Sequence, residues 1–206
     1  HGDDLVFIAE NGTFVTRGDE ELSSDTMDRA FVDSLIAEIR GFRHDVGVVL
    51  CGKASAYIER TDAAFRDQAE KYYARLADVA DLTAVDDDIL KIAVFDVEDG
   101  EKNTAPALER HRLTHQVVAS GHHWVDVMNQ GVSKGKALRA IQNLLDVTPE
   151  QTAVFGDYLN DLDMMDAADF SFAMANAHPD VAAAARYRAP SNVDHGVIQV
   201  LERLLG

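Results

Sequence analysis

The last third of this 206-residue chain alternates short apolar runs with stretches of helical period. Apolar runs of four residues, bounded by turn residues, predict buried strands. Repeated strand and helix units of this length predict a parallel sheet with right-handed crossovers, because a helix must return the chain before the next parallel strand. Strands are predicted at residues 152–155 and 170–173, and helices at 133–145, 160–167, 179–185 and 196–205.

Two capping signals predict where helical turns begin in this last third. Ser133 is suited to cap the first helix, whose apolar positions 137, 138, 141, 144 and 145 are expected to face inward. Thr148 and Gln151 have the spacing of a capping box, with proline at the first helical position between them. The last third of the chain is therefore predicted to form a regular α/β unit.

The first two thirds of the chain have a different pattern, with more strands than helices. Residues 5–9 and 13–15 flank the turn Asn11-Gly12 and predict a hairpin. Helices are expected after an Asp25 cap and a Thr61 cap. This mixture of several strands and two helices indicates an α+β module. Its strands are predicted at residues 46–50, 56–58, 89–95, 116–120 and 124–127.

Charge and cysteine content exclude several classes of protein. The chain has 19 Lys and Arg against 36 Asp and Glu, a formal net charge of −17. Such a protein is repelled by nucleic-acid backbones and anionic membranes. One cysteine cannot form an internal disulfide, no window approaches the roughly 18 apolar residues of a membrane span, and no signal peptide is visible. We therefore expect a cytoplasmic protein that binds neither nucleic acid nor membrane.

The sharpest motif is residues 156–161, Gly-Asp-Tyr-Leu-Asn-Asp, directly after a predicted strand. In an open parallel sheet this turn lies at the carboxyl edge, where ligands bind. Asp157 offers the hard oxygen that Mg²⁺ prefers, and Asn160 can donate a hydrogen bond to an anion. Taken alone, the same residue types are also common in turns and helix caps.

A second motif, residues 131–136, Gly-Val-Ser-Lys-Gly-Lys, opens the preceding helix. A lysine at a helix start opposes the macrodipole, so Lys134 is interpreted as a phosphate ligand, the alternative being a solvated basic helix start. The segment is not a Walker A loop, because that motif would need glycine at Gln130 and Ser or Thr at Ala137.

These stretches, in this order, resemble the haloacid dehalogenase superfamily of phosphatases, in particular its Cof-type, sugar-phosphatase branch. The resemblance covers essentially the whole chain. It implies a core with a parallel sheet and helices on both faces, interrupted by an inserted α+β cap. It is carried by residues 8–12 (Ile-Ala-Glu-Asn-Gly), 131–135, 156–161, 172–177 (Phe-Ala-Met-Ala-Asn-Ala), 51–57 and 87–91. Residues 1–18 and 128–206 are then expected to form the core and residues 19–127 the cap.

The resemblance also implies residue roles. Asp157 is expected to bind Mg²⁺, assisted by the carbonyl of Tyr158, while Lys134 neutralises the phosphate and orients the nucleophile. Asn160 would donate to the phosphate and Asp161 would support the metal shell. These roles suit phosphoryl transfer, which depends on positioning and charge stabilisation. Further candidate substrate contacts are Asn11, Lys53 and Tyr57.

The family's first motif, a strand ending in Asp-x-Asp-Gly-Thr, and its second, a strand ending in Ser or Thr, are not found before Glu10. We therefore expect the nucleophile and general acid to lie upstream of these 206 residues, and the segment alone to be inactive. One internal candidate, residues 96–100 (Asp-Val-Glu-Asp-Gly), follows an apolar strand. Its second carboxylate is a glutamate and its glycine comes one position late, so we interpret it as an acidic turn of the cap.

The expected function is Mg²⁺-dependent hydrolysis of a small phosphate monoester, most plausibly a sugar phosphate, through an aspartyl-phosphate intermediate. A non-catalytic module that binds phosphate or sugar phosphate is the alternative from a different class. A phosphomutase is a third possibility, because it would share every motif present in this chain. Oligomeric state is not readable from the residues.

Overall fold

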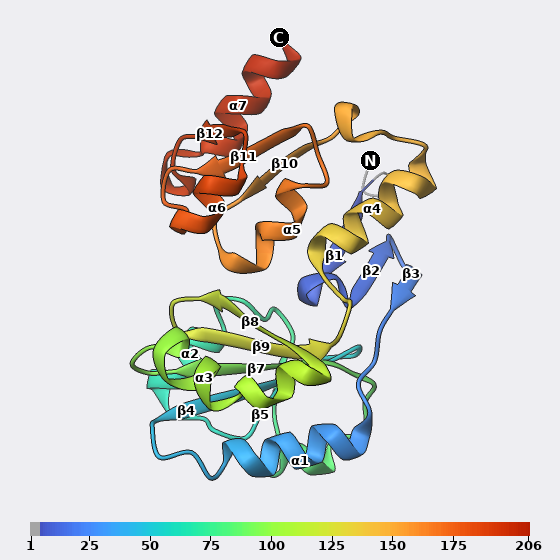
Figure 1. Ribbon diagram of the computed structural model, residues 1–206. Coiled ribbons are helices and arrows are strands. Elements are labelled where there is room, and N and C mark those ends of the chain that lie inside the picture. The colour runs from blue at the N-terminus through green and yellow to red at the C-terminus, as the bar shows by residue number, and fades with distance from the viewer. Residues whose placement is uncertain (1–4) are drawn as a thin grey trace. The chain divides into compact units, whose positions relative to one another are not determined.

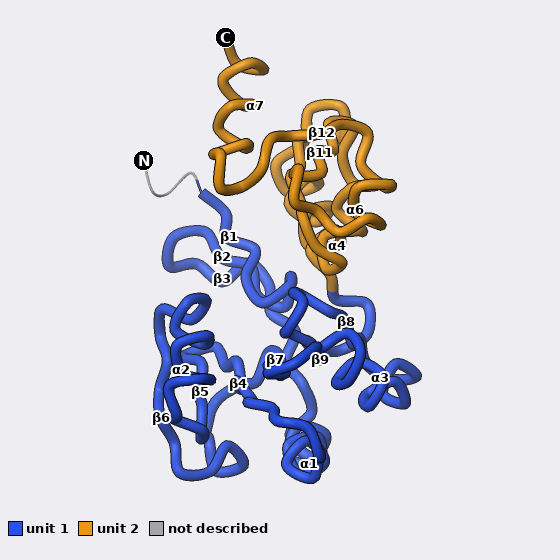
Figure 2. Tube along the Cα trace, turned by 90° about the vertical axis from the view of Figure 1, so that its left-hand side faces the viewer, with its two compact units in different colours: residues 1–132 blue, residues 133–206 orange. Residues whose placement is uncertain are grey.

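The computed structural model describes residues 5–206. The chain divides into two compact units, residues 1–132 and 133–206, which Figure 2 shows in different colours. The first four residues, on which part of the predicted N-terminal core segment and the expectation of no signal peptide fall, lie outside the described residues. Assignment of residues 1–18 and 128–206 to a core and of 19–127 to a cap stays a prediction.

The second unit contains a three-stranded parallel sheet in the order β10-β11-β12 (Figure 1). This confirms the parallel sheet predicted from the alternation of strands and helices. In the pairing of β10 with β11, Gly156 lies opposite Ala173, so the ends of both strands meet at the same edge. The strands are β10 (Ala153–Gly156), β11 (Phe170–Met174) and β12 (Tyr187–Ala189).

Helices cover both faces of this sheet, which confirms the expected α/β class. On β11, Ala173 packs into one apolar cluster with α5 and α6, while its neighbours Phe172 and Met174 pack into another with α7. This alternation follows from the two-residue period of a strand. The helices are α4 (Lys134–Leu145), α5 (Leu162–Met165), α6 (Pro179–Ala184) and α7 (Gly196–Leu205), with short turns at Pro149–Gln151, Leu159–Asp161 and Asn192–Asp194.

Three details of the second unit differ from the sequence prediction. The helix predicted over residues 160–167 is instead a short turn followed by α5, and β12 was not predicted. Leu144 and Leu145, expected to face inward, are 57% and 48% exposed. Both lie in the last turn of α4, beyond the part of the helix that packs through Leu138. The caps at Ser133 and Thr148 are confirmed.

The first unit begins with a three-stranded antiparallel sheet of β1 (Val6–Ala9), β2 (Phe14–Arg17) and β3 (Glu20–Ser24). A single short turn, Glu10–Gly12, joins β1 to β2. This confirms the predicted hairpin and adds a third strand that was not predicted. The hairpin sheet belongs to the same compact unit as the strands that follow it.

The remainder of the first unit is built on a six-stranded sheet in the order β6-β5-β4-β7-β9-β8 (Figure 1). Its pairs are antiparallel except β5 with β6. All eight residues of the central strand β7 are buried. The strands are β4 (Val46–Gly52), β5 (Ala56–Ile58), β6 (Leu76–Asp78), β7 (Ile89–Asp96), β8 (His115–Gly121) and β9 (Trp124–Asn129).

Each face of this sheet has its own apolar cluster. Along β4, Val48 and Leu50 pack on the side of α1, whereas Val49 and Cys51 pack on the side of Phe65 in α2. Alternate residues of one strand thus serve two cores, as expected for a sheet covered on both faces. The helices are α1 (Arg29–Ile39), α2 (Ala63–Ala69) and α3 (Ala105–Ala107), with helical turns at Leu82–Ala84, Gly100–Thr104 and Glu109–Leu113.

Both predicted helix starts in the first unit are corrected. The cap of α1 is Asp28, whose carboxylate accepts from the amide of Phe31 at 3.0 Å, and not Asp25. Asp62, and not Thr61, precedes α2, which ends at Ala69. Residues 72 and 73 lie beyond this helix. Among the helices of residues 5–206, none has both the length and the apolar character needed to cross a membrane.

Candidate functional site

Lys134, the first residue of α4, forms an ion pair with Asp161. Its Nζ lies 2.6 Å from Oδ1 of Asp161, whose residue is 5% exposed. A lysine at a helix N-terminus is opposed by the macrodipole, and a nearby carboxylate offsets that repulsion. The structure thus brings together two of the predicted catalytic residues, which lie 27 positions apart in the chain.

The same carboxylate organises the turn that carries the predicted metal ligand. Oδ2 of Asp161 accepts from the amides of Asp157 at 3.0 Å and Tyr158 at 3.4 Å. A Cβ on Gly156 would lie 2.7 Å from Cβ of Asp161, so only glycine leaves room for this arrangement. Asp161 therefore fixes the backbone of the turn and the lysine at once.

Asp157 is held at the carboxyl end of β10 by the segment that follows β11. Its Oδ2 accepts from Nδ2 of Asn176 at 3.2 Å, and its carbonyl accepts from the amide of His178 at 2.8 Å. The sequence prediction gave Asn176 no role. Its position after the second parallel strand was the available signal, because adjacent parallel strands end at the same edge.

A second contact missed by the sequence prediction joins α4 to α5. Oδ2 of Asp163 accepts from the amide of Gly135 at 3.1 Å. This amide is one of the first in the helix and has no partner within it, so the carboxylate satisfies it. A Cβ at Gly135 would lie 2.4 Å from the carbonyl oxygen of Asp163, which shows how closely the two segments approach.

Tyr158 and Asn160 lie in the same turn and are half-buried. The Tyr158 ring meets the His178 ring edge-on, with centroids 5.7 Å apart. Asn160 lies in the short turn Leu159–Asp161 that precedes α5. The second unit thus gathers all five predicted metal and phosphate residues around one sheet edge.

The donor atoms at this edge fit a magnesium ion. Among residues 5–206, no three His, Cys, Asp or Glu side chains gather at metal-binding spacing. Mg²⁺ does not need such a cage, because one or two carboxylates suffice when phosphate oxygens and water complete the shell. Asp157 and the carbonyl of Tyr158 are the residues that would hold it.

The predicted substrate residue Asn11 belongs to a buried polar cluster of the first unit. Nδ2 of Asn11 lies 2.5 Å from Oδ2 of Asp126 in β9, and Nζ of Lys91 in β7 lies 3.3 Å from the same oxygen. Lys91 also pairs with Oε2 of Glu10 at 2.8 Å. Burial alone lowers the pKa of Lys91, but the neighbouring Asp126 and Glu10 carboxylates outweigh it and hold this pKa well above its usual value.

Lys53 and Tyr57, the other predicted substrate residues, lie in the first unit with different partners. Lys53 pairs with Glu21 at 2.9 Å, and the Tyr57 hydroxyl donates to Asp87 at 2.9 Å. Tyr57 packs against the cluster on the α1 face, whereas its neighbour Ala56 belongs to the cluster on the α2 face. Their substrate contacts stay predictions.

Asp96, the internal nucleophile candidate, ends β7 and is fully buried. Its carboxylate accepts from the amides of Glu98 at 2.9 Å and Asp99 at 3.0 Å, and from the Thr104 hydroxyl at 2.8 Å. These bonds close the turn after the strand and leave the carboxylate without exposed surface. The structure supports a structural role for Asp96.

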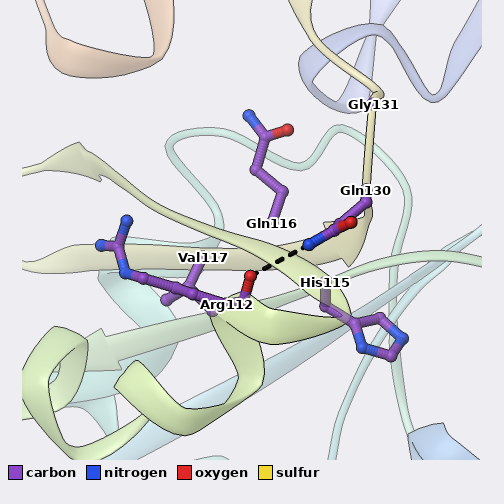
Figure 3. A pocket seen from close by; sticks show the side chains of 6 residues that line it. All are labelled: Arg112, His115, Gln116, Val117, Gln130 and Gly131. Carbon is purple, nitrogen blue, oxygen red and sulfur yellow. Dashed lines mark hydrogen bonds between the residues drawn. The ribbon is translucent and has the colours of Figure 1, made fainter.

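A hollow of about 330 Å³ near the start of β8 is lined by residues that include Arg112, His115 and Gln130. Figure 3 shows the Arg112 and His115 side chains pointing away from each other. Gln130 donates to the carbonyl of Arg112 at 2.9 Å, so its amide is already engaged (Figure 3). These polar groups do not converge on one ligand.

Comparison with known proteins identifies the family of this chain. The family described as haloacid dehalogenase-like hydrolase matches residues 1–201. The chain belongs to this family. The match of nearly the whole chain confirms the resemblance inferred from the motifs.

Relatives of this haloacid dehalogenase-like hydrolase include phosphatases. The chain is 34% identical to the 5-amino-6-(5-phospho-D-ribitylamino)uracil phosphatase YbjI of Escherichia coli K12 over 207 residues, covering 98% of this chain and 75% of that one. Among solved structures, SMU.1108c of Streptococcus mutans UA159 is 26% identical with a TM-score of 0.89, covering 98% and 77%. A subclass IIB sugar phosphatase has the same fold, with a TM-score of 0.79, 19% identity and coverage of 97% and 75%.

Proposed function

We propose that this haloacid dehalogenase-like hydrolase is a Mg²⁺-dependent phosphatase that hydrolyses a small phosphate monoester. The observation that carries the proposal is the coupling of Lys134, Asp161 and Asp157 at the carboxyl edge of β10. A cation and a hard carboxylate ligand are held there by one buried carboxylate. Phosphoryl transfer requires this combination, because its catalysis consists mainly of positioning and charge stabilisation.

Each residue has a defined task in this mechanism. The Lys134 ammonium neutralises a phosphoryl oxygen and orients the attacking carboxylate, while Asn160 donates to another phosphoryl oxygen. Asp161 holds the Lys134 ammonium through an ion pair and the Asp157 backbone through a hydrogen bond. Asn176 orients the Asp157 carboxylate through its hydrogen bond.

Asp157 and the Tyr158 carbonyl would hold Mg²⁺, whose charge offsets that of the phosphoryl oxygens. The attacking group is a carboxylate that forms an aspartyl phosphate. No Asp-x-Asp-Gly-Thr motif occurs in the 206 residues, and the nearest match, Asp96, is buried. We propose that a segment outside these residues supplies the nucleophile and the general acid.

The relatives support a small phosphorylated metabolite as substrate. YbjI is named for a phosphorylated ribitylaminouracil, and a structural neighbour is named a sugar phosphatase. We propose a phosphate ester of a sugar or sugar alcohol, acting in the cytoplasm.

The test is Mg²⁺-dependent phosphate release from a panel of sugar and sugar-alcohol phosphates. Protein carrying an upstream Asp-x-Asp-Gly segment should be active, and the 206-residue chain alone inactive. Asp157→Ala should abolish release, while Asp166→Ala, at an exposed carboxylate of the same unit, should retain it. Full activity of Asp157→Ala would contradict the metal assignment, and tight phosphate binding without turnover in the extended protein would favour the binding module.

A further inference from the structure

Two histidine rings of the first unit pack on one phenylalanine ring. The His115 ring, at the start of β8, stacks on the Phe31 ring of α1, with centroids 3.5 Å apart and 6° between the planes. The His111 ring, in the helical turn that precedes β8, meets the same Phe31 ring edge-on with centroids 5.5 Å apart. Phe31 packs in turn against the apolar cluster on the α1 face of the sheet. The three rings therefore join the start of β8 to α1.

The two histidines differ in their charged partners. Nε2 of His111 lies 2.7 Å from Oε2 of Glu38, which also accepts from Arg110 at 2.6 Å. Burial alone raises the pKa of Glu38, but the hydrogen bonds from Arg110 and His111 outweigh it and hold this pKa below its usual value. Nδ1 of His115 lies 2.9 Å from the Thr114 hydroxyl, and among residues 5–206 no carboxylate pairs with His115. A positive charge on His111 is thus balanced, whereas one on His115 is not.

Carboxylates of the elements packed around His115 are bound to other groups. In the turn before β8, Glu109 pairs with Arg112 at 2.8 Å. On the side of α1 and β9, three carboxylates bind the Asn129 amide, the Phe31 backbone amide and the Arg29 guanidinium, namely Asp25, Asp28 and Asp33. A protonated His115 would therefore face the cationic side chains of the preceding turn without a counter-charge of its own.

The stacked position makes protonation of His115 unfavourable. Burial and the nearby His111 lower the pKa of His115 below its usual value of about 6.5. A cation is attracted to the face of an aromatic ring, but the lost hydration and the like charge outweigh that attraction here. The stacked ring thus binds fewer protons than a released one. By linkage, this contribution to stacking is fully present above about pH 6.5 and is lost as the pH falls.

We propose that His115 is a pH-sensitive switch, which releases the start of β8 from Phe31 when the solution becomes acidic. His111 stays bound to Glu38 and supplies the like charge. Because β8 is an edge strand of the six-stranded sheet, its first residues pair on one side only and can open locally. His115 also lines the hollow near the start of β8, which gives the ring space to move. The switch lies within the first unit and does not depend on the phosphatase assignment.

The test is an NMR titration of the whole chain between pH 8 and pH 5. The His115 ring should titrate at a lower pH than the ring of His195, an exposed residue of the second unit. The Phe31 ring resonances should shift along the same curve as His115. Hydrogen exchange at pH 7 and pH 5, expressed as protection factors, should show at least roughly a threefold loss at the start of β8 and none in the buried strand β7.

Three variants separate the switch from a general effect of acid. His115→Phe keeps a ring that cannot titrate, so protection at the start of β8 should be equal at the two pH values. His111→Gln removes the neighbouring positive charge, so it should raise the pKa of His115 toward its usual value and reduce the loss of protection. His195→Gln is the matched control and should behave like the wild type.

Any of three results would overturn the inference. The first is titration of His115 at or above the pH at which His195 titrates, and the second is a Phe31 ring that does not respond to pH. The third is an undiminished loss of protection in His115→Phe. The first two results come from the wild type, so they decide the question even where a variant does not fold.

Discussion

Nζ of Lys134 lies 2.6 Å from one oxygen of Asp161, and the other oxygen of that carboxylate accepts from the Asp157 amide at 3.0 Å. One buried side chain therefore fixes both the cation and the predicted metal ligand. Replacement of Asp161 should therefore disturb both the position of the Lys134 ammonium and the turn that carries Asp157, although Asp161 need not touch the phosphate. This makes Asp161 a positioning residue in the proposed mechanism.

Asp161→Asn is expected to lower kcat/KM of the extended protein at least a hundredfold, because the neutral amide no longer balances Lys134 and bonds the turn less well. It should also weaken Mg²⁺ activation, which a titration of activity against Mg²⁺ would measure. Asp163→Asn, which keeps an acceptor for the Gly135 amide, is the matched control and should have a much smaller effect. An unchanged Mg²⁺ titration in Asp161→Asn would contradict the coupling.

Lys91→Met is expected to destabilise the first unit by about 3–5 kcal/mol, because it leaves the buried carboxylate of Asp126 and the half-buried carboxylate of Glu10 without their cation. Urea unfolding of the wild type and the variant would measure the change in the free energy of unfolding. Lys102→Met removes a lysine whose side chain is 80% exposed and which pairs with Asp99. That control should cost far less, because solvent screens an exposed ion pair. Similar losses in the two variants would contradict the importance of burial.

Gly135→Ala is expected to destabilise the second unit by about 1–3 kcal/mol, because the new Cβ would lie 2.4 Å from a backbone oxygen of Asp163. The backbone cannot yield as a flexible side chain can. Gly121→Ala is the control, since its Cβ would find its nearest neighbour at 3.7 Å, an ordinary contact. Chemical denaturation of both variants should show a clear loss only for Gly135→Ala.

Asp96 should make stability sensitive to acid. Burial alone raises the pKa of this carboxyl, but hydrogen bonds from Glu98, Thr104 and Asp99 outweigh it and hold the pKa below its usual value. A lowered pKa stabilises the folded state above the unfolded pKa of about 3.9, and this contribution disappears as pH falls through the folded value.

The unfolding free energy of wild type and Asp96→Asn, measured between pH 7 and pH 3, would check this. The wild type should be the more stable above about pH 5, and the difference should shrink below about pH 4. A difference independent of pH would mean that the charge of Asp96 does not contribute. Retained fold with abolished phosphatase activity would instead point to a catalytic Asp96.

Local pattern predicted most of the elements. The strands β10 and β11 and the helix α7 follow directly from the spacing of their apolar residues, which is a property of each short segment by itself. The boundary of α1 was wrong because Asp25 and Asp28 are both chemically suited to cap it. Only the hydrogen bond to the Phe31 amide distinguishes them.

By itself, the sequence determined the fold class, the family resemblance and the residue types at the edge of the parallel sheet, since these depend on period, spacing and motif order. Tertiary structure alone decided that Asp161 joins Lys134 to the Asp157 turn, that Asn176 holds Asp157, and that Lys91 lies between Glu10 and Asp126. These partners lie on separate strands and turns, and a chain's local pattern does not encode which distant groups meet. From sequence alone a charged residue such as Lys91 is expected at the surface. Only the tertiary structure shows that Lys91 is buried, and a buried charge must be paired.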